Sequence, residues 1–148
     1  MSLFSRIKDK LLGNSPILNP EPEFDPELFV YIKIPEDVGP IDRGEKYEDP
    51  LEKHLAETGV GSVSGGGSQL GEERPDGTRP IAFCIIDVDV TDLEKALVVI
   101  RSELEILHAP VGTEIHYTHE GVQLQDELHQ SGWLSAQPRT FLHPGFDI

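Results

Sequence analysis

Two aspartates alternate in the most apolar segment of the chain and are its first candidates for chemistry. Asp87 and Asp89 lie in residues 81–90, whose β-branched side chains predict a central strand. Alternate residues of a strand share a face, and we expect Lys33 of a neighbouring strand on the same face. Two close carboxylates suit acid–base catalysis or a divalent cation, because the pKa of at least one is raised. A solvated face with a cross-strand Lys–Asp pair is favoured, since no cleft is indicated.

Glu114 and His116 form a second candidate group in the segment that predicts the last strand. They are two residues apart and share a face, and His119 follows at the turn. Zinc would accept such ligands if a fourth came from elsewhere. The six histidines form neither a His-x-x-x-His pair nor a His-Glu-x-x-His motif, so ordinary surface histidines are favoured. The sequence therefore predicts no cofactor and leaves Asp87, Asp89, Glu114 and His116 as weak metal candidates.

A run of glycines at residues 65–67, between two serines, has the composition of a phosphate cradle. A phosphate loop needs backbone N–H groups at a helix N-terminus and usually a lysine, whereas this run leads to Glu72 and Glu73. A bulge, a twisted edge or a close backbone approach is the favoured interpretation. The single cysteine, Cys84, excludes an internal disulfide, and its place on the apolar side of a strand predicts a buried, protonated thiol.

The elements that would position these residues follow from hydrophobic periodicity and capping signals. Strands are predicted at 29–34, 60–70, 81–90 and 113–118, with helices that begin at Asp49-Pro50 and at Thr91-Asp92. The order β-α-β-β-α-β predicts an α+β, ferredoxin-like split βαβ sandwich. Its four-stranded antiparallel sheet would have the order 4-1-3-2, with both helices on one face. We place this domain at residues 28–121.

Three further segments lie outside the predicted domain. Residues 1–13 form a basic amphipathic segment, which could lie on anionic lipid but which we expect to pack on its own domain or fray. Residues 14–27 alternate prolines with acidic residues and predict an extended linker. Residues 122–148 predict a C-terminal arm that wraps its own domain or a neighbouring subunit.

The sheet face turned away from the helices is expected to carry apolar side chains that need a cover. Phe29, Tyr31, Phe83 and Ile85 fall on that face, and Trp133 lies in the arm. Left open, this face would be a larger apolar patch than monomers usually expose. The arm, through Trp133, Phe141 or Phe146, or a second subunit in a weak homodimer could cover it. These residues are therefore the candidates for partner binding.

Charge narrows the function classes more than any motif does. Twelve Lys and Arg against 27 Asp and Glu give the 148-residue chain a formal net charge of −15, which disfavours binding to DNA or RNA. No apolar run reaches 18 residues, and no secretory signal is indicated, so a cytoplasmic location is expected.

The favoured function is a non-enzymatic acidic αβ module that binds a protein partner or itself. An immunity-type inhibitor of a basic protein, such as a nuclease toxin, is one specific form, because acidic charge would steer the encounter. A small-molecule or metal-sensing regulatory domain is an alternative. An enzyme that uses Asp87 and Asp89 is the least favoured hypothesis, because no catalytic constellation is indicated.

Overall fold

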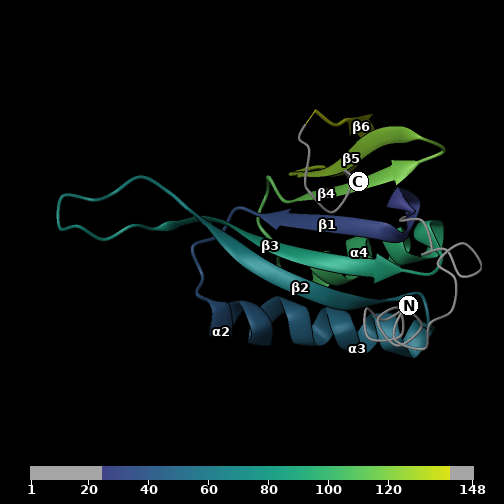
Figure 1. Cartoon of the computed structure of the whole chain (residues 1–148), viewed down its shortest axis with the longest axis horizontal. Helices are drawn as coiled ribbons and strands as arrows, with labels where there is room; N and C mark the ends of the chain where they lie inside the picture. The colour runs from purple at the N-terminus through teal and green to yellow at the C-terminus, as the bar shows by residue number, and fades with distance from the viewer. Residues whose placement is uncertain (1–24, 141–148) are drawn as a thin grey trace, which may run out of the picture.

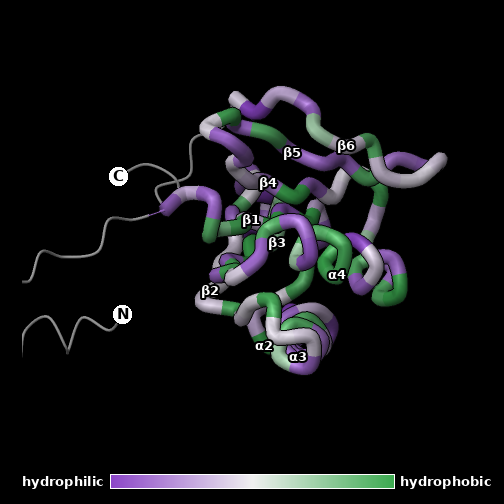
Figure 2. Tube along the Cα trace, turned by 90° about the vertical axis from the view of Figure 1, so that its right-hand side faces the viewer, coloured by the Kyte–Doolittle hydropathy of each residue, from purple (hydrophilic) through white to green (hydrophobic). Residues whose placement is uncertain are grey.

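A six-stranded antiparallel sheet forms the centre of the computed structural model, which describes residues 25–140. The strands lie in the order β2-β3-β1-β4-β5-β6 (Figure 1), and in Figure 2 they follow one another from β6 at the top to β2 beside α2 and α3. The elements are η1 (Pro26–Leu28), β1 (Phe29–Ile34), α2 (Pro40–Arg43), η2 (Gly44–Glu48), α3 (Asp49–Thr58), β2 (Gly61–Leu70), β3 (Ile81–Val90), α4 (Leu93–Ile106), β4 (Glu114–His119), β5 (Val122–His129) and β6 (Gly132–Pro138).

The expected four-stranded ferredoxin-like fold is wrong. The relative order β4-β1-β3-β2 does occur, but β5 and β6 pair onto β4 and make a larger, six-stranded open sheet. Residues 122–138 were expected to belong to a separate arm. They instead continue the sheet, because two tight turns, one at Glu120-Gly121 and one that ends at Gly132, reverse the chain twice, with positive φ angles at Glu120, Gly121 and Gly132.

The core lies on one face of the sheet, between the strands and the helices. Strands β1 and β3 send alternate side chains into it. The side chains with no solvent exposure are Val30, Ile32 and Ile34 of β1 and Cys84, Ile86 and Val88 of β3. Helix α4 contributes Leu97, Ile100 and Leu104 to the same cluster, and α3 contributes Leu51 and Leu55. Strands β1 and β3 therefore turn their alternating aliphatic side chains toward the helices.

Residues 40–58 form one continuous helical stretch, part of which was expected to be a polar loop. Pro40 occupies the start of α2, where a missing N–H is harmless, and the π-helical segment η2 joins it to α3. The stretch ends at Gly59, whose left-handed φ of 68° suits glycine. Helix α4 begins at the predicted Thr91-Asp92 position, but its N-cap is Asp92 rather than Thr91, and the Asp92 side chain accepts a hydrogen bond from the N–H of Lys95.

A buried carboxylate holds the β5–β6 hairpin to the rest of the fold. Asp126 is fully buried on the helix side of β5. It accepts hydrogen bonds from the Tyr117 hydroxyl at 2.6 Å, from Arg101 Nη1 at 2.6 Å and from the Ala136 N–H at 2.9 Å. A buried charge is tolerated when it is paired and hydrogen-bonded in this way. One side chain thus connects β4, β5, β6 and α4.

The β2–β3 hairpin projects well beyond the rest of the sheet (Figure 1). Its connecting loop, Glu72–Arg79, is exposed throughout, and Leu70 is exposed beside it. The turn is held locally, by the Asp76 side chain that accepts hydrogen bonds from the N–H and hydroxyl of Thr78. These two bonds lower the pKa of Asp76, so the turn carries a negative charge.

The remaining expectations about the ends of the chain lie outside the described residues. They concern the basic segment at residues 1–13, most of the linker at 14–27, and the anchors Phe141 and Phe146. Among the residues that are described, no helix is both long enough and apolar enough to cross a membrane.

Leu97 of α4 tests the packing of the helices on the sheet. Leu97→Ala should lower the free energy of unfolding by about 2–5 kcal/mol, because it removes a buried side chain and leaves a cavity. Val98→Ala, one residue further along and 60% exposed, is the matched control and should change it by less than about 0.5 kcal/mol. Urea unfolding of both variants measures the difference. Equal losses from the two would contradict this packing.

Candidate functional site

The sheet face opposite the helices carries most of the residues that the sequence singled out. We call it the helix-free face and define it by the outward residues of β3, β1, β4 and β5, which are Phe83, Ile85, Asp87, Asp89, Phe29, Tyr31, Lys33, Glu114, His116, Gln125 and Glu127. Of the residues that the sequence predicts as candidates, only Trp133 is elsewhere. It packs against the helix-side core from β6, and its indole N–H has no hydrogen-bond partner within the described part of the chain.

A row of polar side chains crosses the middle of this face from strand to strand. The register places Asp87 of β3 opposite Tyr31 of β1, Tyr31 opposite His116 of β4, and His116 opposite Gln125 of β5. The rings of Tyr31 and His116 are 5.2 Å apart between centroids. Cross-strand neighbours lie close enough for their side chains to meet, so the row brings four polar side chains side by side.

The centre of the row is electrically neutral at pH 7. His116 is almost fully buried, and this burial holds its pKa below the usual value even though Glu114 Oε1 lies 2.8 Å from its Nε2 and favours the charged form. Burial also raises the pKa of Tyr31 to about 12, with the charges of Asp87 and Glu114 adding to the effect. Both side chains therefore serve as neutral hydrogen-bonding groups.

Lys33 does not form the cross-strand pair with an aspartate that was expected. The register places it opposite Ile85 on one side and Glu114 on the other. Its Nζ lies over the ring of Phe83, 4.5 Å from the centroid, in a cation–π contact. Phe83 and Ile85 are half-buried, so the apolar part of this face is smaller than the sequence suggested.

Strand β5 extends the face with residues that the sequence analysis did not identify. Glu127 accepts a hydrogen bond from Gln125 Nε2 at 2.7 Å and lies 3.2 Å from His129 Nε2. Its pKa is lowered by the bonds to Gln125 and His129, so it is ionised at neutral pH. The signal was present as alternation from Val122 to Leu128, but a polar residue interrupts it where Asp126 faces the core.

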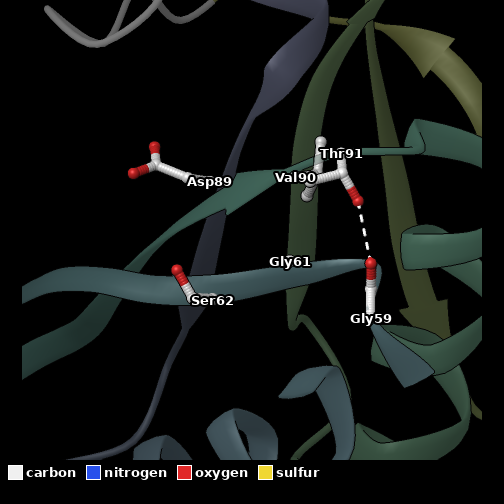
Figure 3. Close-up of a pocket in the computed structure, with 6 residues that line it drawn as sticks. All are labelled: Gly59, Gly61, Ser62, Asp89, Val90 and Thr91. Carbon is white, nitrogen blue, oxygen red and sulfur yellow. Dashed lines mark hydrogen bonds between the residues drawn. The ribbon is translucent and has the colours of Figure 1, made fainter. Parts of the chain in front are cut away.

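The two aspartates of β3 lie in different surroundings. Asp87 is half-buried in the row, whereas Asp89 is exposed near the end of the strand. Asp89 lines an open hollow of about 260 Å³ together with Gly59, Gly61, Ser62, Val90 and Thr91 (Figure 3). Figure 3 shows the Asp89 and Ser62 side chains on the same side of the sheet, as expected for cross-strand neighbours.

The glycine run has a structural explanation in the contact between β2 and the helical stretch. Arg43 Nε lies 2.5 Å from Glu48 Oε1, and Arg43 Nη1 donates to the Gly67 carbonyl at 2.8 Å and to the Ser68 hydroxyl at 3.0 Å. A Cβ at Gly66 would lie 2.6 Å from Glu48 Oε1 and 3.2 Å from the Ile85 carbonyl. Gly66 therefore leaves the space that this buried ion pair needs.

Among the described residues, no three His, Cys, Asp or Glu side chains are placed to hold a metal ion together. Cys84 faces the helices, as expected. Burial raises the pKa of its thiol, whose sulfur lies 3.4 Å from the Glu36 carbonyl oxygen.

Comparisons with known proteins give no assignment. No family model, curated protein or solved structure matches this chain.

The buried histidine makes stability depend on pH. The unfolded chain binds a proton at His116 below about pH 6.5, whereas the folded protein resists it because the folded pKa is lower. The free energy of unfolding should therefore fall as the pH drops through 6.5, by at most about 1.4 kcal/mol per pH unit from this group. Urea unfolding at pH 7.5 and 5.5 measures the change. His116→Gln should show a smaller loss; an equal loss in both proteins would contradict the assignment.

Two neighbouring glycines test the structural role of the run. Gly66→Ala should displace the Arg43–Glu48 pair and cost about 1–3 kcal/mol. At Gly67 an added Cβ would meet nothing within 4 Å, so Gly67→Ala is the matched control. It should be neutral or stabilising by up to about 1 kcal/mol, because alanine loses less entropy in a strand. Thermal and urea unfolding measure the stability of both variants. A larger loss of stability in Gly67→Ala than in Gly66→Ala would show that the run has another role.

Proposed function

We propose that this chain is a non-enzymatic, acidic binding module for a protein partner that carries a basic surface. An inhibitor of a basic enzyme, such as an immunity-type protein against a nuclease toxin, is the specific form that this proposal favours. As part of the same proposal we place the protein in the cytoplasm, where a buried free thiol such as Cys84 stays reduced.

The observation that carries the proposal is how the chain uses its own cations. Three arginines bind groups of this chain. Arg43 binds Glu48 and donates to the Gly67 carbonyl, Arg101 donates to Asp126, and Arg139 donates to the Thr118 hydroxyl. Lys46 is bound to Glu36, at 2.7 Å. Each of these cations is already bound within this chain and so is not available to an acidic partner, while the ion pairs leave the net charge of −15 unchanged.

The acidic groups that remain are widely distributed and exposed. Asp42, Glu45 and Asp49 follow one another on the outer side of the helical stretch, and Glu72 and Glu73 lie on the projecting hairpin. A surface of one sign speeds the approach of an oppositely charged protein and repels nucleic acid and acidic proteins. This distribution supports a basic protein as partner over a small ligand.

A ligand-sensing domain is supported less well. Its natural site would be the polar row of the helix-free face, where Tyr31 and His116 are each 1% exposed. A small molecule could contact only the ends of that row, at Asp87 and Gln125, unless the face opened.

Salt dependence tests the proposed function. The chain, immobilised, should capture a basic protein from extracts of its native host, and the purified pair should form a complex of fixed stoichiometry. Its association rate constant should fall about tenfold or more between 50 and 500 mM salt, while the dissociation rate constant changes little. A captured protein that is acidic, or an association rate that salt leaves unchanged, would contradict the proposal.

Two charge-removing variants are matched controls for that measurement. Asp42→Asn with Glu45→Gln, and Glu72→Gln with Glu73→Gln, remove equal charge from separate exposed parts of the molecule. Long-range steering depends on total charge, so both variants should slow association by a similar factor. A loss confined to the dissociation rate of one variant would instead identify a direct contact.

A further inference from the structure

We infer that the hollow beside Asp89 is a subsite for one arginine side chain of the partner. This inference rests on the proposed function and deepens it, because it names a place on the chain where a basic partner is recognised. The hollow is lined by Gly59, Gly61, Ser62, Asp89, Val90 and Thr91 and lies between the adjoining ends of β2 and β3 (Figure 3).

The backbone makes the hollow, because two of its lining residues have no side chain. Gly61 lies so close to β3 that a Cβ there would be 2.5 Å from the Asp89 carbonyl oxygen. Gly59 ends α3 in the left-handed conformation, and its carbonyl is fixed by a 3.0 Å hydrogen bond from the Thr91 hydroxyl. The Thr91 N–H in turn donates to the Val60 carbonyl at 2.9 Å. The floor is therefore rigid and open.

Two polar side chains at the hollow have no partner within residues 25–140. The Asp89 carboxylate and the Ser62 hydroxyl form no hydrogen bond or ion pair there, although they are cross-strand neighbours on one face. The other carboxylates of the helix-free face differ from it: Glu114 is bound to His116, Glu127 is bound to Gln125, and Asp87 is half-buried and has contacts within the chain. Asp89 is thus an exposed carboxylate that an incoming cation can bind without displacing a contact of this chain.

Size and shape favour a single guanidinium group. A volume of about 260 Å³ is below the range of about 300–1,000 Å³ typical of sites for whole small molecules. A guanidinium is planar and presents several donors, so it can bond the carboxylate and the hydroxyl together while its flat face lies on the glycine backbone. A lysine ammonium has no flat face and would use the hollow less well.

Titration with L-argininamide tests the subsite without the partner. In ¹⁵N-resolved NMR spectra of the full chain, the amide signals of Gly59, Gly61 and Ser62 should shift and saturate at millimolar concentration. Asp89→Asn should weaken this binding at least tenfold, while Glu105→Gln, at an exposed carboxylate on α4, should leave it unchanged. Citrullinamide, which has the same shape without the charge, should produce no saturating shift.

The outcomes separate this inference from the proposed function. If the amides of the hollow do not shift, or shift equally in Asp89→Asn, the subsite is refuted even when a basic partner is captured. If the hollow binds L-argininamide as described but no basic partner is found, the proposed function fails and the preference of the hollow for a guanidinium stands. With both results positive, Asp89→Asn should also weaken the complex more than Glu105→Gln does.

Discussion

The strict alternation of β1 and β3 is the constraint on which the rest of the molecule depends. These two central strands pair along their whole shared length, from Phe29–Asp89 to Ile34–Cys84. Every second side chain is apolar and fully buried under the helices, and the buried area supplies most of the stability of such a domain. A slip of one residue would exchange the faces, so the register is fixed. As a consequence, Asp87, Asp89 and Lys33 have only the helix-free face to occupy.

Local signals predicted the central strands and the start of α4 to within one residue because they act over a few residues. Alternation identified β1 and β3, and Asp92 rather than Thr91 caps α4, whereas the first helical stretch begins at Pro40, ahead of the start predicted at Asp49. The β5–β6 hairpin could not be predicted in this way, because Asp126 stands where the pattern demands an apolar residue. That carboxylate is acceptable only through Arg101 and Tyr117, which belong to other elements. A tertiary network thus replaced the hydrophobic periodicity, and the four-stranded prediction was wrong for this reason.

The packing of the edge strand β2 depends on side chains of the helical stretch. Arg43 lies under β2, binds Glu48 and donates to the Gly67 carbonyl, while Glu52 accepts the Val63 N–H at 2.6 Å. Helix side chains thereby occupy backbone groups on an uncharged, glycine-rich edge strand, which would otherwise be a template for strand pairing with another chain. The same contact pairs one arginine with one glutamate, so it leaves the net charge of the surface unchanged. Protection of the edge strand is therefore the structural role of this contact.

The sequence predicted that the two aspartates share a face, but it could not distinguish their surroundings. Both follow the same alternation within β3, and the difference in their surroundings comes from the neighbouring strands. Asp87 lies opposite Tyr31 in the middle of the sheet, where burial already raises the pKa of Tyr31 to about 12. Asp89 lies beyond, where Gly61 approaches β3 too closely for any side chain and the sheet ends in a hollow. A half-buried carboxylate orders its own chain, whereas an exposed one beside an empty space is available to another molecule, and this difference makes Asp89 the stronger candidate for recognition.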